Sequence, residues 1–293
     1  MTSSHAPATP TVVMTGASAG LGAHTLERLD ATGARTVVGA RTPSPRASVN
    51  LPLDLSSSSS VASFAAEVAR LTGPSGIDAL VLNAGIQYGD NDQRTSEGYE
   101  VTFAVNHVAH FRLLHQLLPL VNDGGRIIIT TSDTHDPALY PVGPSELDVD
   151  GWSDGSAEIT GIQAYAASKL ANLLTAMRLD ADEDLQTRGI RAFAYNPALT
   201  GGTELQRAQP ELRARIADMG AQPQGSGPYV GTPERSGEVL ADLTLGTLEV
   251  PADAFYVSLV RGEVTFPQPS ELARRTGVAD RLWNESVERY LAG

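Results

Sequence analysis

Two side chains suited to proton transfer, Tyr165 and Lys169, lie four residues apart, and Lys169 is the only lysine of the sequence. Alanine and leucine dominate the segment Gln163 to Arg178, which favours a helix and places the phenol and the ammonium on one face. At ~4 Å and an effective dielectric constant of ~20, the positive charge favours phenolate by roughly 4 kcal/mol, or about three pKa units. We therefore expect Tyr165 to be a usable proton donor near neutral pH. The alternative is a surface helix on which the two residues are neighbours without a function.

A glycine-rich turn follows the first apolar run of the sequence. The strand predicted at Pro10 to Met14 leads into Thr15-Gly-Ala-Ser-Ala-Gly-Leu-Gly22, and a helical run comes next. This order of elements directs backbone N–H groups and a helix N-terminus at a phosphate. Gly16 is expected to allow the tight turn, Gly20 the approach of a pyrophosphate, and Gly22 close packing of helix on strand. An ordinary turn between strand and helix is the alternative.

Arg41 comes directly after the second predicted strand, Arg35 to Ala40. A site for NAD usually has Asp or Glu there to bind the ribose 2′-hydroxyl, whereas a 2′-phosphate needs a cation. The sequence therefore predicts NADP(H) as the cofactor. Arg46 could add a second contact, or it could be an ordinary solvated arginine. Asp30 belongs to the preceding helix and is wrongly placed for the ribose.

Three further strands end in residues that could line a ligand site. They are predicted at 51–55, which contains Asp54, at 78–82, which precedes Asn83-Ala84-Gly85, and at 125–131, which precedes Ser132. Parallel sheets bind their ligands at the carboxyl ends of the strands, so these residues are expected at one edge. Asp54 could contact an adenine, cap the next helix, or do both.

Asn106 lies within a long helix that the spacing of apolar residues predicts over 94–118. Asparagine is a poor helix former, and a buried amide must find hydrogen-bond partners, so a specific role is expected. The same segment contains His107, His110 and His115, which have no acidic partners at ligand spacing. They are predicted to be packing or surface residues and not a metal site.

The other predicted elements are less regular. Helices are expected at 56–71, 204–219, 232–245 and 279–291, and strands at 190–195 and 254–259. The insert 133–163 has no clear period and could be a substrate lid or a surface loop, and its acids could attract a cationic substrate or simply be solvated. Residues 204–230, which include a Gly/Pro-rich stretch, are expected to form a flap near the ligand.

Composition limits the class of protein. The chain has 293 residues, 41% of them hydrophobic, and no linker divides it, so we expect one domain over 11–293 after a disordered tail at 1–10. A formal charge of -13 argues against nucleic-acid and anionic-membrane partners. The absence of cysteine excludes a disulfide framework, an iron–sulfur cluster and a thiol nucleophile. With neither a membrane-length apolar run nor a signal-like start, a cytoplasmic protein is expected.

Five motifs occur together and in order: Thr15-Gly16-x3-Gly20-x-Gly22, Asn83-Ala84-Gly85, Asn106, Ser132 and Tyr165-x3-Lys169. In this arrangement they resemble the short-chain dehydrogenase/reductase family over roughly residues 11 to 260. Val105-Asn-His-Val-Ala-His-Phe111 and Tyr165-x2-Ser-Lys-Leu-Ala-Asn172 look like the branch of retinol dehydrogenases, WW-domain oxidoreductases and protochlorophyllide reductases. The predicted fold is α/β, a single-domain Rossmann-type doubly wound parallel sheet with helices on both faces.

The resemblance implies hydride transfer between NADP(H) and a carbonyl/alcohol carbon of a small organic substrate. It makes Tyr165 the acid/base, Lys169 the group that binds the nicotinamide ribose and lowers the phenol's pKa, Ser132 the partner of the substrate oxygen, and Asn106 the holder of a water in the proton relay. The cofactor-binding residues that it implies are Gly16, Ser18, Ala19, Gly20, Leu21, Arg41, Asp54, Leu55, Asn83, Ala84, Gly85, Tyr165, Lys169, Pro197, Leu199 and Thr200.

The sequence departs from the family in the loop after the sixth predicted strand. Ala198 stands where the family usually has glycine, and an extra residue precedes Thr203, which leaves the contacts of Thr200 and Thr203 open. Because the sequence has no cysteine, the light-driven protochlorophyllide reaction is not expected. Two alternatives stay open: an NADP(H)-binding sensor or scaffold without turnover, and a reductase of C=N or C=C bonds. Monomer and homodimer are both open, and the sequence does not identify the substrate.

Overall fold

The computed structural model describes residues 9–201, 205, 207, 209–220 and 230–291. Most of the predicted tail and Thr203 lie outside these residues. Within them, eight strands form one sheet in the order β3-β2-β1-β4-β5-β6-β7-β8, and every neighbouring pair is parallel except β7 and β8. The strands are β1 Thr11–Thr15, β2 Arg35–Ala40, β3 Val49–Pro52, β4 Ile77–Leu82, β5 Val121–Thr130, β6 Arg191–Asn196, β7 Tyr256–Val260 and β8 Glu263–Thr265.

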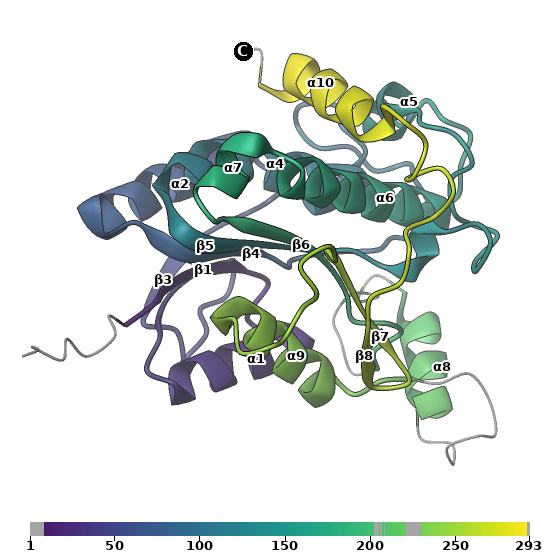
Figure 1. The fold of residues 1–293 in the computed structure, drawn as a ribbon. Coiled ribbons are helices and arrows are strands. Elements are labelled where there is room, and N and C mark those ends of the chain that lie inside the picture. The colour runs from purple at the N-terminus through teal and green to yellow at the C-terminus, as the bar shows by residue number, and fades with distance from the viewer. Residues whose placement is uncertain (1–8, 202–204, 206, 208, 221–229, 292–293) are drawn as a thin grey trace, which may run out of the picture.

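Helices cover both faces of the sheet, as the doubly wound fold requires (Figure 1). They are α1 Gly20–Ala31, α2 Ser58–Thr72, α3 Val101–Phe103, α4 Ala109–Leu117, α5 Val149–Asp154, α6 Gly161–Asp180, α7 Glu183–Thr187, α8 Pro210–Gly220, α9 Pro233–Leu245 and α10 Val278–Tyr290. Helices α2, α4 and α6 lie on one face and α1 and α9 on the other. Each face has its own hydrophobic cluster, because strands buried on both sides supply apolar residues to both.

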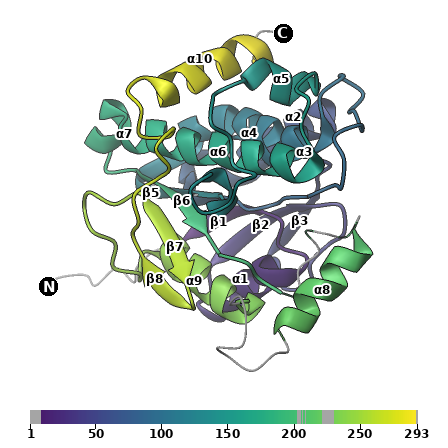
Figure 2. The same cartoon turned by 90° about the vertical axis from the view of Figure 1, so that its right-hand side faces the viewer.

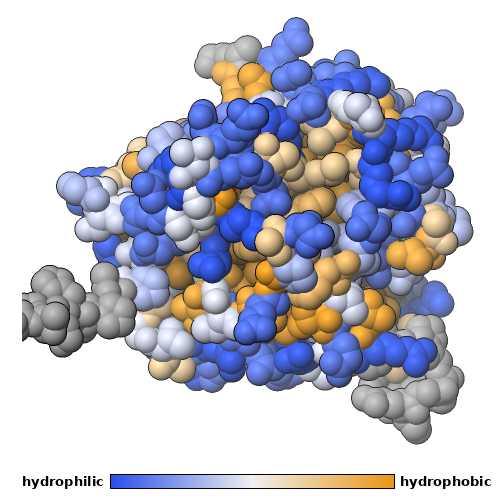
Figure 3. Space-filling view, viewed as in Figure 1, coloured by the Kyte–Doolittle hydropathy of each residue, from blue (hydrophilic) through white to orange (hydrophobic). Residues whose placement is uncertain are grey.

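Two elements at the C-terminal end of the chain extend this core. Helix α10 lies outside α6 and α4, where Trp283 meets Phe111 with ring centroids 5.2 Å apart. Strand β8 closes the edge of the sheet as an antiparallel hairpin with β7, and apolar residues gather over this end of the molecule (Figure 3). Figure 2 shows the end of the molecule at which α8 lies beside the sheet.

The predicted strands and most helices are present, but the helix expected over 94–118 is not one helix. Helical structure begins only at Val101, because the Glu100 carboxylate accepts hydrogen bonds from the N–H groups of Thr102 (2.9 Å) and Phe103 (2.6 Å) and so caps α3. A π-helical turn, Ala104–Val108, then separates α3 from α4. The prediction was therefore wrong for 94–100, where Gly98 has a φ of 87°.

Other boundaries differ less. Strand β3 ends at Pro52, so Asp54 lies in the turn before α2 and not in the strand, and α2 begins two residues later than predicted, at Ser58. Helix α8 begins at Pro210, so the helix predicted from residue 204 starts too early. The short elements α5, α7 and β8 were not predicted, because each is too short to show a period.

Candidate active site

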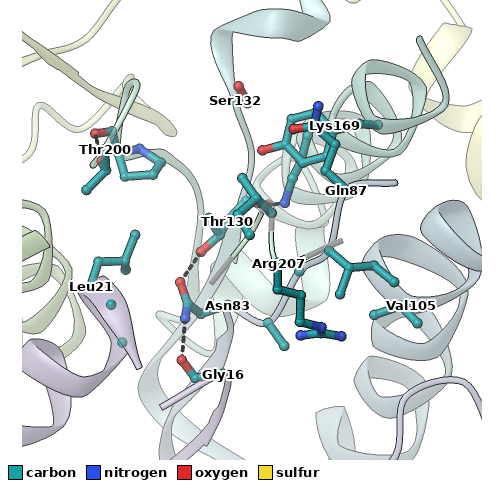
Figure 4. Close-up of a pocket in the computed structure, with 18 of the residues that line it drawn as sticks. Gly16, Leu21, Asn83, Gln87, Val105, Thr130, Ser132, Lys169, Thr200 and Arg207 are labelled. Carbon is teal, nitrogen blue, oxygen red and sulfur yellow. Dashed lines mark hydrogen bonds between the residues drawn. The ribbon is translucent and has the colours of Figure 1, made fainter. Parts of the chain in front are cut away.

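A cleft of about 540 Å³ opens at the carboxyl ends of the strands (Figure 4). Every cofactor-binding residue predicted from the sequence lines it, and so does Ser132. Asn106 does not line the cleft but lies fully buried behind it. The loops after β1, β4, β5 and β6 therefore converge on one space, as the order of motifs predicted.

The glycine turn has the shape that a phosphate needs. Gly16 has a φ of 71° and Gly20 a φ of 55°, values that suit glycine. A Cβ atom at Gly22 would lie 1.9 Å from the Gly16 carbonyl oxygen, so the close approach of α1 to β1 depends on this glycine. The N-cap of α1, Ala19, makes no side-chain capping bond and the first turn has no acid. The free N–H groups at this end can bind an anion.

The two arginines after β2 have different surroundings. Arg41 lines the cleft and is exposed, whereas Arg46 forms an ion pair with Glu27 at 2.9 Å. Asp54 accepts hydrogen bonds from the N–H (2.9 Å) and the hydroxyl (2.7 Å) of Ser56, which hold the pKa of its carboxyl below the usual value. Of the two arginines after β2, Arg41 is thus the one that faces the cleft.

Tyr165 and Lys169 meet near the carboxyl end of β5. The Lys169 Nζ atom donates to the Thr130 carbonyl at 3.1 Å and lies 5.4 Å from the centre of the Tyr165 ring. Burial raises the pKa of Tyr165, an effect that hydrogen bonding with Ser132 opposes and the charge of Asp133 reinforces. Burial also lowers the pKa of Lys169 to about 8. The expected lowering of the phenol's pKa is therefore not found, because burial disfavours the charged phenolate.

Asn106 sits in the π-helical turn and has no free hydrogen-bonding atom. Its side-chain oxygen accepts from the Ile86 N–H (2.8 Å), and its amide nitrogen donates to the Ile86 carbonyl (2.9 Å) and the Ser168 hydroxyl (3.0 Å). Its main-chain carbonyl accepts from His110 Nδ1 (3.0 Å) and the Asn172 amide (3.1 Å). The residue ties the loop after β4 to helix α6.

His110, predicted as a packing or surface residue, is buried and connects two of the motifs. The Thr15 hydroxyl accepts from the N–H groups of Asn83 (3.0 Å) and Ala84 (3.1 Å), so its own proton points to His110 Nε2 at 3.0 Å. Burial lowers the pKa of His110 to about 3, which keeps the ring neutral. The i,i+4 spacing was a sequence signal for the contact of His110 with the Asn106 carbonyl, whereas nothing in the sequence indicated the contact with Thr15. Among the described residues, no group of three or more His, Asp or Glu side chains could hold a metal ion.

Much of the cleft wall was not predicted. These lining residues come from the loop after β4, from the insert 133–163 and from the segment around α8; they are Ile86, Gln87, Tyr88, Asp133, Tyr140, Ile162, Leu205, Arg207, Leu212, Ile216 and Met219. They give no sequence signal because their spacing follows the shape of the cleft and not a helical or strand period.

Ala198 adopts a left-handed conformation with a φ of 58°. Alanine is strained there by about 1–2 kcal/mol, which the lower chain entropy of alanine offsets only in part. We expect Ala198→Gly to raise the free energy of unfolding by about 0.5–1 kcal/mol in urea titrations. Ala47→Gly, in a loop without positive φ, should lower it instead. A loss of stability in Ala198→Gly would contradict this account of the loop.

In the part of the chain that the structure describes, no helix combines the length and the apolar character that a membrane crossing demands.

The sequence and structure are similar to known proteins. A family model described as short chain dehydrogenase matches residues 10–139. The WW domain-containing oxidoreductase of Drosophila melanogaster is 32% identical over 67% of this chain, which spans 50% of that protein. Human retinol dehydrogenase 12 is 27% identical over 94% of this chain and 85% of its own.

Solved structures agree with these relatives. The crystal structure of an uncharacterised protein from Mycobacterium paratuberculosis has a TM-score of 0.69 and 28% identity, and covers 95% of this chain and 92% of its own. A blue fluorescent protein from a metagenomic library, solved in complex with NADPH, has a TM-score of 0.58 and 25% identity, and covers 80% of this chain and 90% of its own.

Proposed function

Because the chain belongs to the short-chain dehydrogenase/reductase family, in its retinol dehydrogenase-like branch, we propose that it is an NADP(H)-dependent oxidoreductase acting on a carbonyl/alcohol carbon. The observation that carries this proposal is the set of residues that line one cleft. An uncapped helix N-terminus and a glycine turn lie in it together with Ser132, Tyr165 and Lys169. An anionic cofactor and a proton donor can therefore act in the same space.

The lining residues fit NADP(H). The turn Gly16 to Gly22 would hold the pyrophosphate at the N-terminus of α1, and Arg41 would bind the 2′-phosphate. Asp54 would lie at the adenine end and Lys169 at the nicotinamide ribose. The similar NADPH-bound structure supports this choice of cofactor. When bound, NADPH supplies the hydride that the substrate carbon accepts.

Tyr165 would donate a proton to the substrate oxygen, and Ser132 would hydrogen-bond the same oxygen. Since burial raises the pKa of Tyr165, the phenol is protonated at neutral pH and suited to the reduction direction. In that direction the carbonyl carbon gains a hydride, the oxygen gains the phenol proton, and Tyr165 recovers a proton from solvent. Lys169, whose pKa is about 8, is mostly an ammonium at pH 7 and would stabilise the transient phenolate.

Arg41→Ala should lower the affinity for NADPH by about 10–100-fold and leave the affinity for NADH nearly unchanged. Only NADPH carries the 2′-phosphate that the guanidinium would bind. Both affinities can be measured by titrating the fluorescence of the reduced cofactor. Arg46→Ala is the matched control, since Arg46 already pairs with Glu27. An unchanged ratio of the two affinities in Arg41→Ala would remove Arg41 from cofactor selection.

Turnover is tested by following NADPH absorbance with a panel of ketones and aldehydes. We expect oxidation of NADPH with at least one of them. Tight NADPH binding without oxidation across the panel would instead favour the sensor alternative, and neither binding nor oxidation would end the proposal.

A further inference from the structure

An acidic side chain lies in the cleft beside the proposed proton donor. Asp133 follows Ser132 at the carboxyl end of β5 and lines the same space as Tyr165. The Ser132 hydroxyl donates to its Oδ1 atom at 3.3 Å, and the side chains of Asn196 and Tyr140 are close enough to couple to its titration. The carboxylate is therefore in direct contact with the group expected to hold the substrate oxygen.

No cationic side chain among the described residues forms an ion pair with Asp133. The His135 imidazole acts on it electrostatically, and burial lowers the pKa of that imidazole. Arg207 also lines the cleft but has interaction partners of its own. Burial raises the pKa of the Asp133 carboxyl, hydrogen bonding with Ser132 and the nearby His135 oppose that rise, and no ion pair within the described residues does so.

The field of this carboxylate reaches the reacting groups. Asp133 contributes to the raised pKa of Tyr165, Tyr140 and Tyr256, the phenols that face it from α6, the insert and β7. During carbonyl reduction the substrate oxygen gains negative charge next to Ser132. An unpaired carboxylate one residue away opposes that charge, unless a cation in the substrate balances it.

We propose that Asp133 binds a protonated amine next to the reacting carbon, so that the substrates are amino ketones and amino alcohols. The inference rests on the proposed function and names the substrate class of the same site. The apolar side chains of Leu199, Leu212 and Ile216 in the same cleft would pack against the rest of such a molecule. The substrate ammonium would form with the Asp133 carboxylate the ion pair that no described side chain provides.

Two probes of equal shape test the proposal without turnover. Calorimetric titration at pH 7 compares 2-amino-1-phenylethanol, which is an ammonium, with 1-phenylpropan-1-ol, in which a methyl group replaces it. The protein is saturated with NADPH first, because neither alcohol can pass a hydride to the reduced cofactor, and binding of NADPH itself is measured separately. We expect the ammonium probe to bind about 100-fold more tightly, the range of a charge-assisted hydrogen bond in a partly buried site.

Asp133→Asn should remove that preference, whereas Asp136→Asn, which removes a carboxylate of the same segment outside the cleft, should keep it. Equal affinity of the two probes in the wild type, or no binding of either, overturns the inference. So does an equal loss for both probes in Asp133→Asn, because Asp133 would then act by positioning Ser132. Failure to bind NADPH would count against the proposed function instead.

Discussion

Replacing Tyr165 by phenylalanine is expected to lower kcat by about 1,000-fold or more and to leave NADPH affinity within about threefold of the wild type. The phenol proton is the one that the substrate oxygen needs, and no other side chain of the described cleft combines a titratable O–H with contact to Ser132. The ring itself is kept, so the packing around α6 is preserved. NADPH absorbance reports turnover, and fluorescence titration reports cofactor binding.

The control for this variant is Tyr99→Phe. Tyr99 is half-buried, and its hydroxyl donates to the Arg289 carbonyl at 3.4 Å, but it lies outside the cleft. It should retain wild-type kcat. Wild-type turnover in Tyr165→Phe would exclude the phenol from the reaction, and loss of NADPH binding would show that the hydroxyl serves the cofactor.

Asn106→Ala should reduce the free energy of unfolding by about 3 kcal/mol or more and reduce turnover together with it. The change leaves the N–H and carbonyl of Ile86 without their partner in a buried place, and the Ser168 hydroxyl, which still donates to the Tyr165 carbonyl, loses the bond that it accepts. Each orphaned buried group costs about 1–3 kcal/mol, and the loop after β4 loses its link to α6. Urea titration and NADPH-dependent turnover measure the two effects.

Asn122→Ala provides the comparison, because the Asn122 amide also donates two hydrogen bonds, to the Ser75 carbonyl and to Asp78, both at 2.9 Å. This asparagine is half-buried at the start of β5, far from the carboxyl ends of the strands. Asn122→Ala should lower the free energy of unfolding by less than about 1.5 kcal/mol and leave turnover intact. Equal effects of the two variants would mean that Asn106 has no special place in the site.

Sequence patterns predicted the fold because they are local. The run Thr11 to Thr15 and the glycine turn after it are contiguous, and a parallel sheet brings the ends of its strands to one edge. Ser132 and Tyr165 could thus be placed in one cleft without any knowledge of their contacts. The roles of these residues in catalysis stay predictions until the variants are measured.

Features that depend on long-range contacts could not be predicted. The hydrogen bond between Thr15 and His110 joins residues 95 positions apart and has no pattern in the sequence. The lowering of the phenol's pKa was expected from one charge at one distance, but the burial of Tyr165, which reverses the shift, results from the whole fold. Asp133 was one acid among several in a segment without a period, and only its position beside Ser132 distinguishes it.

The single lysine has one more consequence. Lys169 is 2% exposed and lines the cleft, so an amine-directed acylating reagent would reach the only ε-amino group of the sequence through the cleft. A cofactor bound at the nicotinamide ribose position would stand in its way. The speed at which this residue becomes acylated would therefore report how far the cleft is occupied, with no probe introduced.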